Sequence, residues 1–494
     1  MVAKGDLIEM SQKYLHVVLL MWGVVLVEGI KVPVDFKFGT ATASYQVEGG
    51  WNASGKGENI WDRLTHTHPE LITDHSTGDI SCDSYNKWKE DVQILKKVGV
   101  DFYRFSLSWS RILPTGFTNK INPDGLRYYN DLINELLKNN IEPMVTIYHW
   151  DLPQPIQDLG GWTNAQTAVY LEDFARVVFD NFGDRVKKWI TINEPASICE
   201  GVYGNSDGAP DVKSPGIGDY LCGKSILLAH ARIYHLYNSK YRSEQKGKVG
   251  ITIDSIWAEP KTNSSVDIAA AEREMQMGLG WWMNPIFTKN GDYPLVMKSR
   301  IGSISKVENF SESRLVPLYK KDIKFIRGTA DFLGLNHYHT WLVSNHEYPV
   351  DAPTSYNKDK GTAMEKDPNW KPSPTIVPWG LRKLLNWVKK EYDNPLVYIT
   401  ETGYPDGGNM NDVDRATYIK TYAAAAVQAV TIDGCNVKGF TVWSIMDNME
   451  WRAGYTVKFG IYHVDFNSPN RTRTAKLSAK TYTDIIKRRS IPDN

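Results

Sequence analysis

Cysteine is scarce in this sequence. Its 494 residues include only Cys82, Cys199, Cys222 and Cys435. Four cysteines in a chain of this length exclude a fold held together mainly by disulfide bonds, and the sequence has no Cys-x-x-Cys pair or His/Cys cluster that would predict a metal site. Cys199 and Cys222 either pair in an oxidising compartment or remain free buried thiols.

Net charge and long hydrophobic runs are also lacking. Lys plus Arg and Asp plus Glu both number 57, so the formal net charge is zero, which argues against nucleic acid or an anionic membrane surface as the main partner. The longest apolar stretch, residues 14–27, follows Lys13 and is too short for an ordinary membrane span. We interpret residues 1–29 as a secretory signal peptide and expect no stable membrane association of residues 30–494.

Four N-x-[ST] sequons fit a secreted protein. The expected location is extracellular, and a digestive lumen is one such location. They begin at Asn52, Asn263, Asn309 and Asn470. Each is a predicted glycosylation site, because this tripeptide is the acceptor in secreted chains.

Aromatic residues, in contrast, are abundant, with 17 Trp and 26 Tyr. They fit either a large aromatic core or a cleft whose flat rings suit the faces of sugars. Strand-like runs alternate with helical patterns along residues 30–494, which predicts one (β/α)8 barrel domain with long loops at the carboxyl ends of its strands, including 203–218 and 346–378. The strand-like runs are 36–41, 102–107, 144–148, 189–193, 249–253, 332–336, 396–400 and 439–443; the helical patterns are 91–98, 124–138, 171–182, 223–241, 381–392 and 414–432.

Two of the strand-like runs end in a glutamate. Ile-Thr-Ile-Asn-Glu ends at Glu194, and Val-Tyr-Ile-Thr-Glu ends at Glu401. A carboxylate at the end of a buried strand is costly unless something uses or pairs it, and a salt bridge would explain either one alone. Because the carboxyl ends of barrel strands share one face, we expect the two to face each other, as chemistry on a glycosidic bond requires.

These motifs resemble glycoside hydrolase family 1, the β-glucosidase family, over residues 33–488. The resemblance is greatest to its secreted animal branch, in particular insect digestive β-glucosidases. It is carried by FGTATASYQVEG (38–49), YRFS (103–106), YHWD (148–151), TINEP (191–195), ITETG (399–403), WS (443–444) and DNMEW (447–451).

The resemblance implies a role for each glutamate. Glu401 is expected to be the nucleophile, and Glu194 the general acid and then the general base of a retaining mechanism. Arg104 and Tyr338 are expected to hold Glu401 as an anion, while a less compensated pocket raises the pKa of Glu194. Asn193 is expected to contact the sugar 2-hydroxyl.

The same resemblance implies a sugar pocket and no cofactor or metal. Glu450, as an anion, would repel a 6-phosphate, which argues against a phospho-β-glucosidase. Trp379 is either an aglycone platform or an ordinary loop anchor. The expected substrate-binding residues are Gln46, His149, Trp150, Asn193, Asn336, Tyr338, Trp379, Trp443, Glu450 and Trp451.

Three positions depart from the family pattern. Thr402 stands where many members have Asn, Met449 where Phe is usual, and Ala196 where a bulky residue is frequent. Ala196, Ser197 and Glu200 follow the acid/base motif towards the aglycone side, so they put the leaving-group preference in doubt.

The predicted function is a retaining β-glucosidase that removes terminal β-D-glucosyl residues from small-molecule glycosides. The sequence leaves open whether galactosyl or fucosyl residues are also removed. One alternative is a myrosinase-type thioglucosidase acting on glucosinolates, against which acidic Glu200 weighs because their sulfate needs basic groups. The other is a catalytically inactive klotho-like binding protein, against which the retention of both glutamates weighs. No oligomeric state is predicted.

Overall fold

Eight parallel strands form a closed barrel in the computed structural model, which describes residues 29–492. Neighbours follow in chain order, and β12 pairs with β2 to close the barrel. All eight predicted strands are confirmed, with ends that differ by up to two residues, while the signal peptide predicted at 1–29 lies outside the described residues except for Gly29. The strands are β2 (Lys37–Ala41), β3 (Phe102–Ser106), β4 (Glu142–Tyr148), β5 (Lys188–Asn193), β6 (Lys248–Asp254), β8 (Phe332–Asn336), β11 (Val397–Thr402) and β12 (Val437–Trp443).

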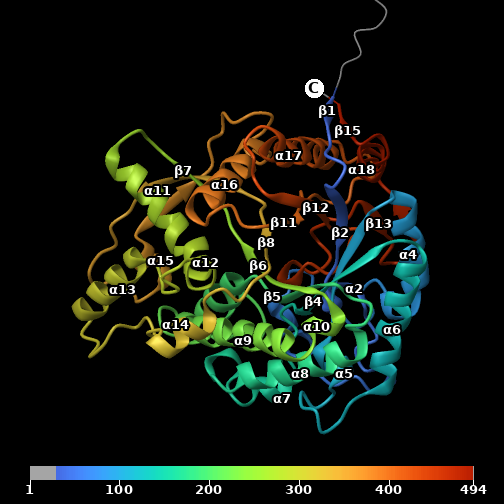
Figure 1. Ribbon diagram of the computed structural model, residues 1–494, viewed down its shortest axis with the longest axis horizontal. Coiled ribbons are helices and arrows are strands. Elements are labelled where there is room, and N and C mark those ends of the chain that lie inside the picture. The colour runs from blue at the N-terminus through green and yellow to red at the C-terminus, as the bar shows by residue number, and fades with distance from the viewer. Residues whose placement is uncertain (1–28, 493–494) are drawn as a thin grey trace, which may run out of the picture.

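Helices surround the barrel on all sides (Figure 1). α6 shows why the sequence forms them: Asn122 caps its first turn by accepting a hydrogen bond from the Asp124 amide, and Leu132 and Leu136 face the core at helical spacing. The predicted helical segments are confirmed as α4 (Ser84–Val98), α6 (Pro123–Lys138), α8 (Thr167–Phe182), α9 (Gly218–Lys240), α16 (Pro378–Glu391) and α17 (Val413–Thr431).

Further helices lie in the connections and at the carboxyl end of the chain. They are α2 (Ser44–Val47), α3 (Ile60–Thr67), α5 (Trp109–Ile112), α7 (Gln154–Gln157), α10 (Arg242–Gln245), α11 (Ser265–Met277), α12 (Leu279–Phe287), α13 (Leu295–Val307), α14 (Lys320–Ile326), α15 (Tyr356–Lys360) and α18 (Leu477–Arg488). The connections also hold the π-helix η4 (Ser197–Gly204) and the 3-10 turns η1 (Ala53–Gly55), η2 (Pro69–Leu71), η3 (Gly161–Thr163) and η5 (Trp451–Ala453).

Large side chains fill the barrel near the amino ends of its strands. This inner cluster consists of Phe102, Met144, Ile190, Phe332 and Tyr398. A Cβ at position 39 would lie 2.4 Å from the Phe102 ring, so glycine there lets the ring enter. Because the amino half is packed with apolar groups, the polar residues of the barrel are left at the carboxyl ends.

Short strands complete the fold outside the barrel. β7 (Trp257–Pro260), β9 (Thr340–Asn345) and β10 (Thr362–Glu365) form a three-stranded sheet, and β13 (Tyr462–Val464) pairs with β14 (Arg473–Ala475). β1 (Ile30–Lys31) pairs with β15 (Ser490–Ile491), so the two ends of the described chain lie side by side (Figure 1). The segment 346–378, expected to be a loop, contains α15 and β10, because Tyr356 is buried against Trp281 and β10 pairs with β9.

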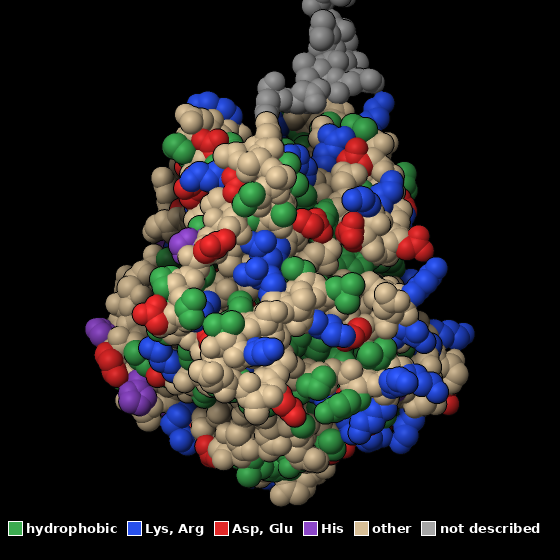
Figure 2. Space-filling model, turned by 90° about the vertical axis from the view of Figure 1, so that its left-hand side faces the viewer, with side chains coloured by type: hydrophobic (Ala, Val, Ile, Leu, Met, Phe, Trp, Pro, Cys, Tyr) green, Lys and Arg blue, Asp and Glu red, His purple; other side chains and the backbone are tan. Residues whose placement is uncertain are grey.

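Charged groups of both signs are interspersed on the face shown in Figure 2, with hydrophobic side chains scattered among them. Within residues 29–492, no helix has the length and apolar character needed to cross a bilayer.

Candidate active site

The carboxyl ends of the strands bring both predicted glutamates into one hydrogen-bonded network. Glu401 is 4% exposed and Glu194 is 7% exposed. Buried Arg104, on β3, donates to Oε1 of Glu401, and its Nη2 donates to Oδ1 of Asn193 at 2.6 Å. Asn336 then links the two sides, because its Nδ2 lies 3.2 Å from Asn193 Oδ1 and 2.6 Å from Glu194 Oε1.

Glu401 has a partner on each carboxylate oxygen. Arg104 forms an ion pair with one, and the Tyr338 hydroxyl donates to the other at 2.8 Å. Burial, followed by the negative charge of Glu401, raises the pKa of Tyr338 well above its usual value, so the phenol keeps its proton for this bond. A buried carboxylate with a cation and a donor is favoured as an anion.

Glu194 has no cation among its hydrogen-bond partners. Asn336 donates to one oxygen, and the Ser197 hydroxyl donates to the other at 3.1 Å. Burial raises the pKa of Glu194 well above its usual value, and the nearby acids Asp254 and Glu401 raise it further. Glu194 is therefore favoured as a neutral, protonated acid beside an ionised Glu401, as expected from the sequence.

Three residues around the site have a left-handed backbone that L-residues adopt rarely. The φ angles are +74° at Trp150, +50° at Glu194 and +51° at Trp451. Each such conformation costs about 1–3 kcal/mol and persists only where the surroundings fix it. Here those surroundings include the indole of Trp150, which donates to the carbonyl of Asn193 at 3.0 Å.

Aromatic rings line the side of the site next to β4 and β12. The His149 ring lies 5.9 Å from both Trp443 and Trp451, tilted by less than 30° from each, and Trp150 lies 4.7 Å from Trp451. Tyr45 supports the Trp451 ring from behind at 6.3 Å. Flat apolar surfaces held in this way suit the C–H faces of a sugar ring.

Unpartnered polar atoms lie beside these rings. The Nε2 of Gln46 donates to the Met449 carbonyl at 2.8 Å, while its Oε1 is buried without a protein partner. The Nδ1 of His149 is likewise buried and unpartnered, and Trp443 donates to one oxygen of Glu450 at 3.0 Å. A ligand with several hydroxyl groups would supply the missing partners.

The environment of Glu450 changes one argument made from the sequence. Burial raises the pKa of Glu450 to about 8, against the opposing effect of its hydrogen bond from Trp443. This shift disfavours the anion of Glu450 near neutral pH. The expected repulsion of a 6-phosphate by a permanent negative charge is weaker than the sequence alone indicated.

The contacts of Trp379 are with residues outside the hydrogen-bonded network of the two glutamates. It stands in the first turn of α16, where its ring packs edge-on against Trp370 at 5.4 Å and lies 4.9 Å from the Lys383 amine. It lines a cavity with Ile30 and Pro492, residues of or next to the terminal strands. Its position matches the loop-anchor alternative and gives no support to an aglycone platform.

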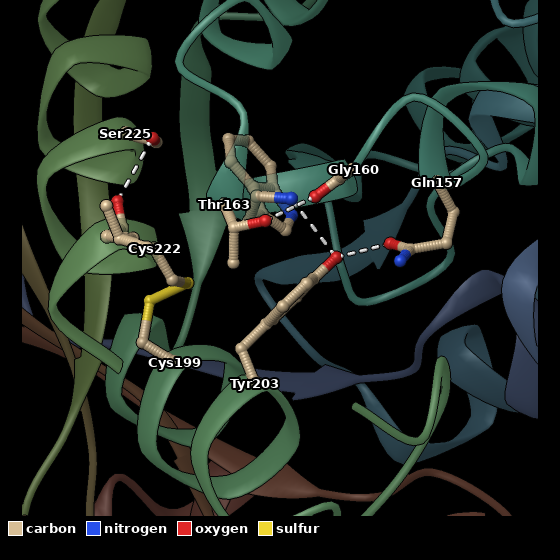
Figure 3. Close-up of a disulfide and its surroundings, with 9 residues drawn as sticks. Gln157, Gly160, Thr163, Cys199, Tyr203, Cys222 and Ser225 are labelled. Atoms are coloured by element: carbon tan, nitrogen blue, oxygen red, sulfur yellow. Dashed lines mark hydrogen bonds between the residues drawn. A yellow bond between two sulfur atoms is a disulfide. The ribbon is translucent and has the colours of Figure 1, made fainter. Parts of the chain in front are cut away.

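A disulfide fixes the segment that follows Glu194. Cys199 in η4 bonds to Cys222 in α9, with a Cα–Cα distance of 5.4 Å. Further along η4, the Tyr203 hydroxyl donates to Gln157 at 2.5 Å and accepts from the amide of Trp162 at 3.1 Å (Figure 3). The helix that carries Ser197 is thus tied to three other elements, α9, α7 and η3.

The disulfide is expected to stabilise the fold. A bond that closes a loop of this length, with a sequence separation of 23, contributes about 3 kcal/mol through the entropy of the unfolded chain. Cys199→Ala/Cys222→Ala should therefore lower the free energy of unfolding, measured by urea denaturation, by about that amount. The matched control is Cys82→Ala/Cys435→Ala, which removes two buried free thiols; an equal loss in both variants would contradict the prediction.

One acidic residue of the site escaped the sequence analysis. Asp254 is the last residue of β6, so it has the same signal that identified Glu194 and Glu401, an apolar strand ending in a carboxylate. The expected strand stopped at position 253, just as the expected strands before the two glutamates stopped at 193 and 400, but none of the motifs that carry the family resemblance covers position 254. Burial, together with the charges of the acids Glu200 and Glu401, raises the pKa of Asp254 to about 7.

The site and the barrel together define a glycoside hydrolase with two buried glutamates at strand ends. Within residues 29–492, no cluster of His, Cys, Asp and Glu has the arrangement of a metal site. The family model described as Glycosyl hydrolase family 1 matches residues 29–491, and the chain belongs to this family.

Two similar proteins and one similar solved structure agree with this assignment. The chain is 49% identical over 462 residues to Myrosinase 1 of Brevicoryne brassicae, covering 92% of this chain and 98% of that one. It is 41% identical over 460 residues to the cytosolic beta-glucosidase of Homo sapiens, covering 92% and 98%. A solved structure of aphid myrosinase superposes with a TM-score of 0.89 at 48% identity, covering 92% and 99%. The chain is thus a glycoside hydrolase that acts on small glycosides.

Proposed function

We propose that this protein is a retaining β-glucosidase that hydrolyses terminal β-D-glucosides by double displacement. The observation that carries the proposal is the contrast between the two glutamates. Glu401 has a cation and a phenol as partners, whereas Glu194 is buried beside other acids with a raised pKa. One environment suits a nucleophile and the other suits a proton donor.

In the first step, a carboxylate oxygen of Glu401 attacks the anomeric carbon while the glycosidic C–O bond breaks. Glu194 gives its proton to the departing oxygen. In the second step, Glu194 takes a proton from water, the water oxygen bonds to the anomeric carbon, and the Glu401 ester bond breaks. Arg104 and Tyr338 keep Glu401 oriented between the two steps through their hydrogen bonds.

The glycone would lie against the aromatic rings, with its hydroxyls on the unpartnered atoms of Gln46 and His149 and on Glu450. Asn193 would contact the 2-hydroxyl, because Arg104 and Asn336 hold its amide oxygen and leave its Nδ2 bonded only to His149 at 3.1 Å. Bonds to the 2-hydroxyl strengthen as the transition state forms.

A thioglucosidase activity is the second candidate. It is favoured by the 49% identity to a protein named Myrosinase 1. Glu200, in η4 beyond Ser197, is partly buried and acidic, so it does not supply the basic group that a sulfate-bearing aglycone needs. A sulfate-free glucoside fits that position better.

Two measurements test the proposal. Proton NMR of a β-glucoside digest should show β-glucose first, because two displacements retain the configuration; α-glucose as the first product would overturn it. A kcat/KM panel over an aryl β-glucoside, cellobiose and a glucosinolate should favour the oxygen glucosides. A higher value for the glucosinolate would establish the thioglucosidase instead.

We also propose that the protein is secreted and glycosylated. The side chains of Asn52, Asn263, Asn309 and Asn470 are all exposed, and a disulfide is present. Secretion from eukaryotic cells and a loss of apparent mass after treatment with an N-glycan amidase would support this, and retention inside the cell would contradict it.

A further inference from the structure

Asp254 makes a third carboxyl group beside the two glutamates. It ends β6, the strand between β5 and β8, and its register partner on β8 is Asn336. Asn336 in turn donates to Glu194. Three neighbouring strands therefore place Asp254 next to the acid of the proposed mechanism.

The Ser197 hydroxyl is the second donor to Glu194. It donates to Oε2 of Glu194 at 3.1 Å, while Asn336 donates to Oε1. Because both donors are neutral, no cation compensates the anion of Glu194, and its proton depends on the charges of the neighbouring acids.

Among residues 29–492, no cation forms an ion pair with Asp254 as Arg104 does with Glu401. Its Oδ1 is buried without a hydrogen-bond partner, and the charged side chains that act most strongly on it, Glu200 and Glu401, are both acidic. A buried carboxyl group in such surroundings is costly for the fold. Its cost is explained if it serves the neighbouring Glu194.

We propose that Asp254 is a positioning residue that keeps the proton on Glu194 as the pH rises. The proposal rests on the proposed role of Glu194 as general acid. It adds to that role a titrating partner at the end of the neighbouring strand β6, whose register partner Asn336 donates to Glu194.

The direction of the effect follows from the sign of the charge on Asp254. Burial raises the pKa of Asp254 to about 7, and the charge of Asp254 is the second cause, after burial, that raises the pKa of Glu194. The new negative charge makes ionisation of Glu194 more costly. Glu194 therefore stays protonated to a higher pH than it would without Asp254.

Other titratable or charged groups also face this pair. They are Glu401 on β11, Glu200 in η4, Arg104 on β3, and His337 and Tyr338 after β8.

The test is the pH profile of kcat/KM for a substrate whose departure needs a proton, such as an alkyl β-glucoside. Asp254→Asn keeps the shape and removes the charge, so the alkaline limb should move down by about one pH unit. Above that limb the activity should fall about tenfold relative to the unchanged protein, while activity near pH 5 is retained. Asp254→Glu should restore the limb. Asp433→Asn, which removes an acid paired with Arg382 far from the site, should leave it unmoved.

Further readouts separate a charge effect from a loss of folded enzyme and from a failure of the mechanism. Titration of active sites with a 2-fluoro glucoside that traps the glycosyl-enzyme counts the folded molecules in each variant. With a dinitrophenyl glucoside, whose leaving group needs no proton, the shift of the alkaline limb should disappear.

An alkaline limb of kcat/KM that does not move in Asp254→Asn would overturn the role of Asp254. If Glu194→Gln keeps the alkaline limb, the proposed role of Glu194 itself fails, and the two results are thus distinguishable.

Discussion

Replacing Glu401 by glutamine is expected to lower kcat/KM for every β-glucoside by about four orders of magnitude or more, because no other group can form the covalent intermediate. The amide has nearly the shape of the carboxylate, so packing is retained. It lacks the charge that pairs with Arg104, and its NH2 cannot accept the hydrogen bond from Tyr338. The measurement is steady-state hydrolysis together with mass spectrometry for a covalent glucosyl-enzyme, which should be absent.

Glu142→Gln is the matched control for this substitution. Glu142 begins β4 at the opposite end of the barrel and pairs with Lys188 at 2.5 Å. This variant should keep kcat/KM within about twofold, since partly exposed ion pairs contribute little. Activity of Glu401→Gln close to that of the control would remove Glu401 from the mechanism and revive the inactive binding protein as an interpretation.

Replacing Glu194 by glutamine is expected to give a loss that depends on the leaving group. General acid catalysis contributes about 10²–10⁴-fold, so alkyl glucosides and cellobiose should lose activity in that range. A dinitrophenyl glucoside should form the glucosyl-enzyme almost normally, because dinitrophenolate leaves without a proton. Its steady-state turnover should still be slow, since no base activates water.

Azide provides the decisive measurement for this variant. An anion that needs no deprotonation should replace water, raise the turnover of the dinitrophenyl substrate and give β-glucosyl azide. A uniform loss over all leaving groups, without rescue by azide, would indicate that Glu194 supports the structure of the site and does not transfer the proton.

Both variants probe residues that local sequence pattern was able to predict. Apolar runs of five to seven residues fix the strands, because a barrel strand is buried on both faces. The position of Glu194 and Glu401 at the ends of such runs then follows from the architecture, since the carboxyl ends of all barrel strands lie on one face. Asp254 was missed because none of the motifs that carry the family resemblance covers its position.

Trp379 shows the limit of the same reasoning. A tryptophan in a loop gives no sign of its direction, and the structure turns its ring towards Trp370 and Lys383. The pairing of Cys199 with Cys222 was likewise left open by the sequence. It depends on how η4 packs against α9, which no local pattern specifies.

The sequence by itself determined the order of strands and helices, the family and the identity of the two glutamates, because these depend on short-range periodicity and on motifs. The tertiary structure decided the surroundings of each carboxyl group. Arg104 reaches Glu401 across 297 positions of sequence, whereas Glu194 lies beside Asp254 and only neutral donors. The different surroundings of these carboxyl groups arise from burial and from contacts between distant strands, and both exist only once the barrel has closed.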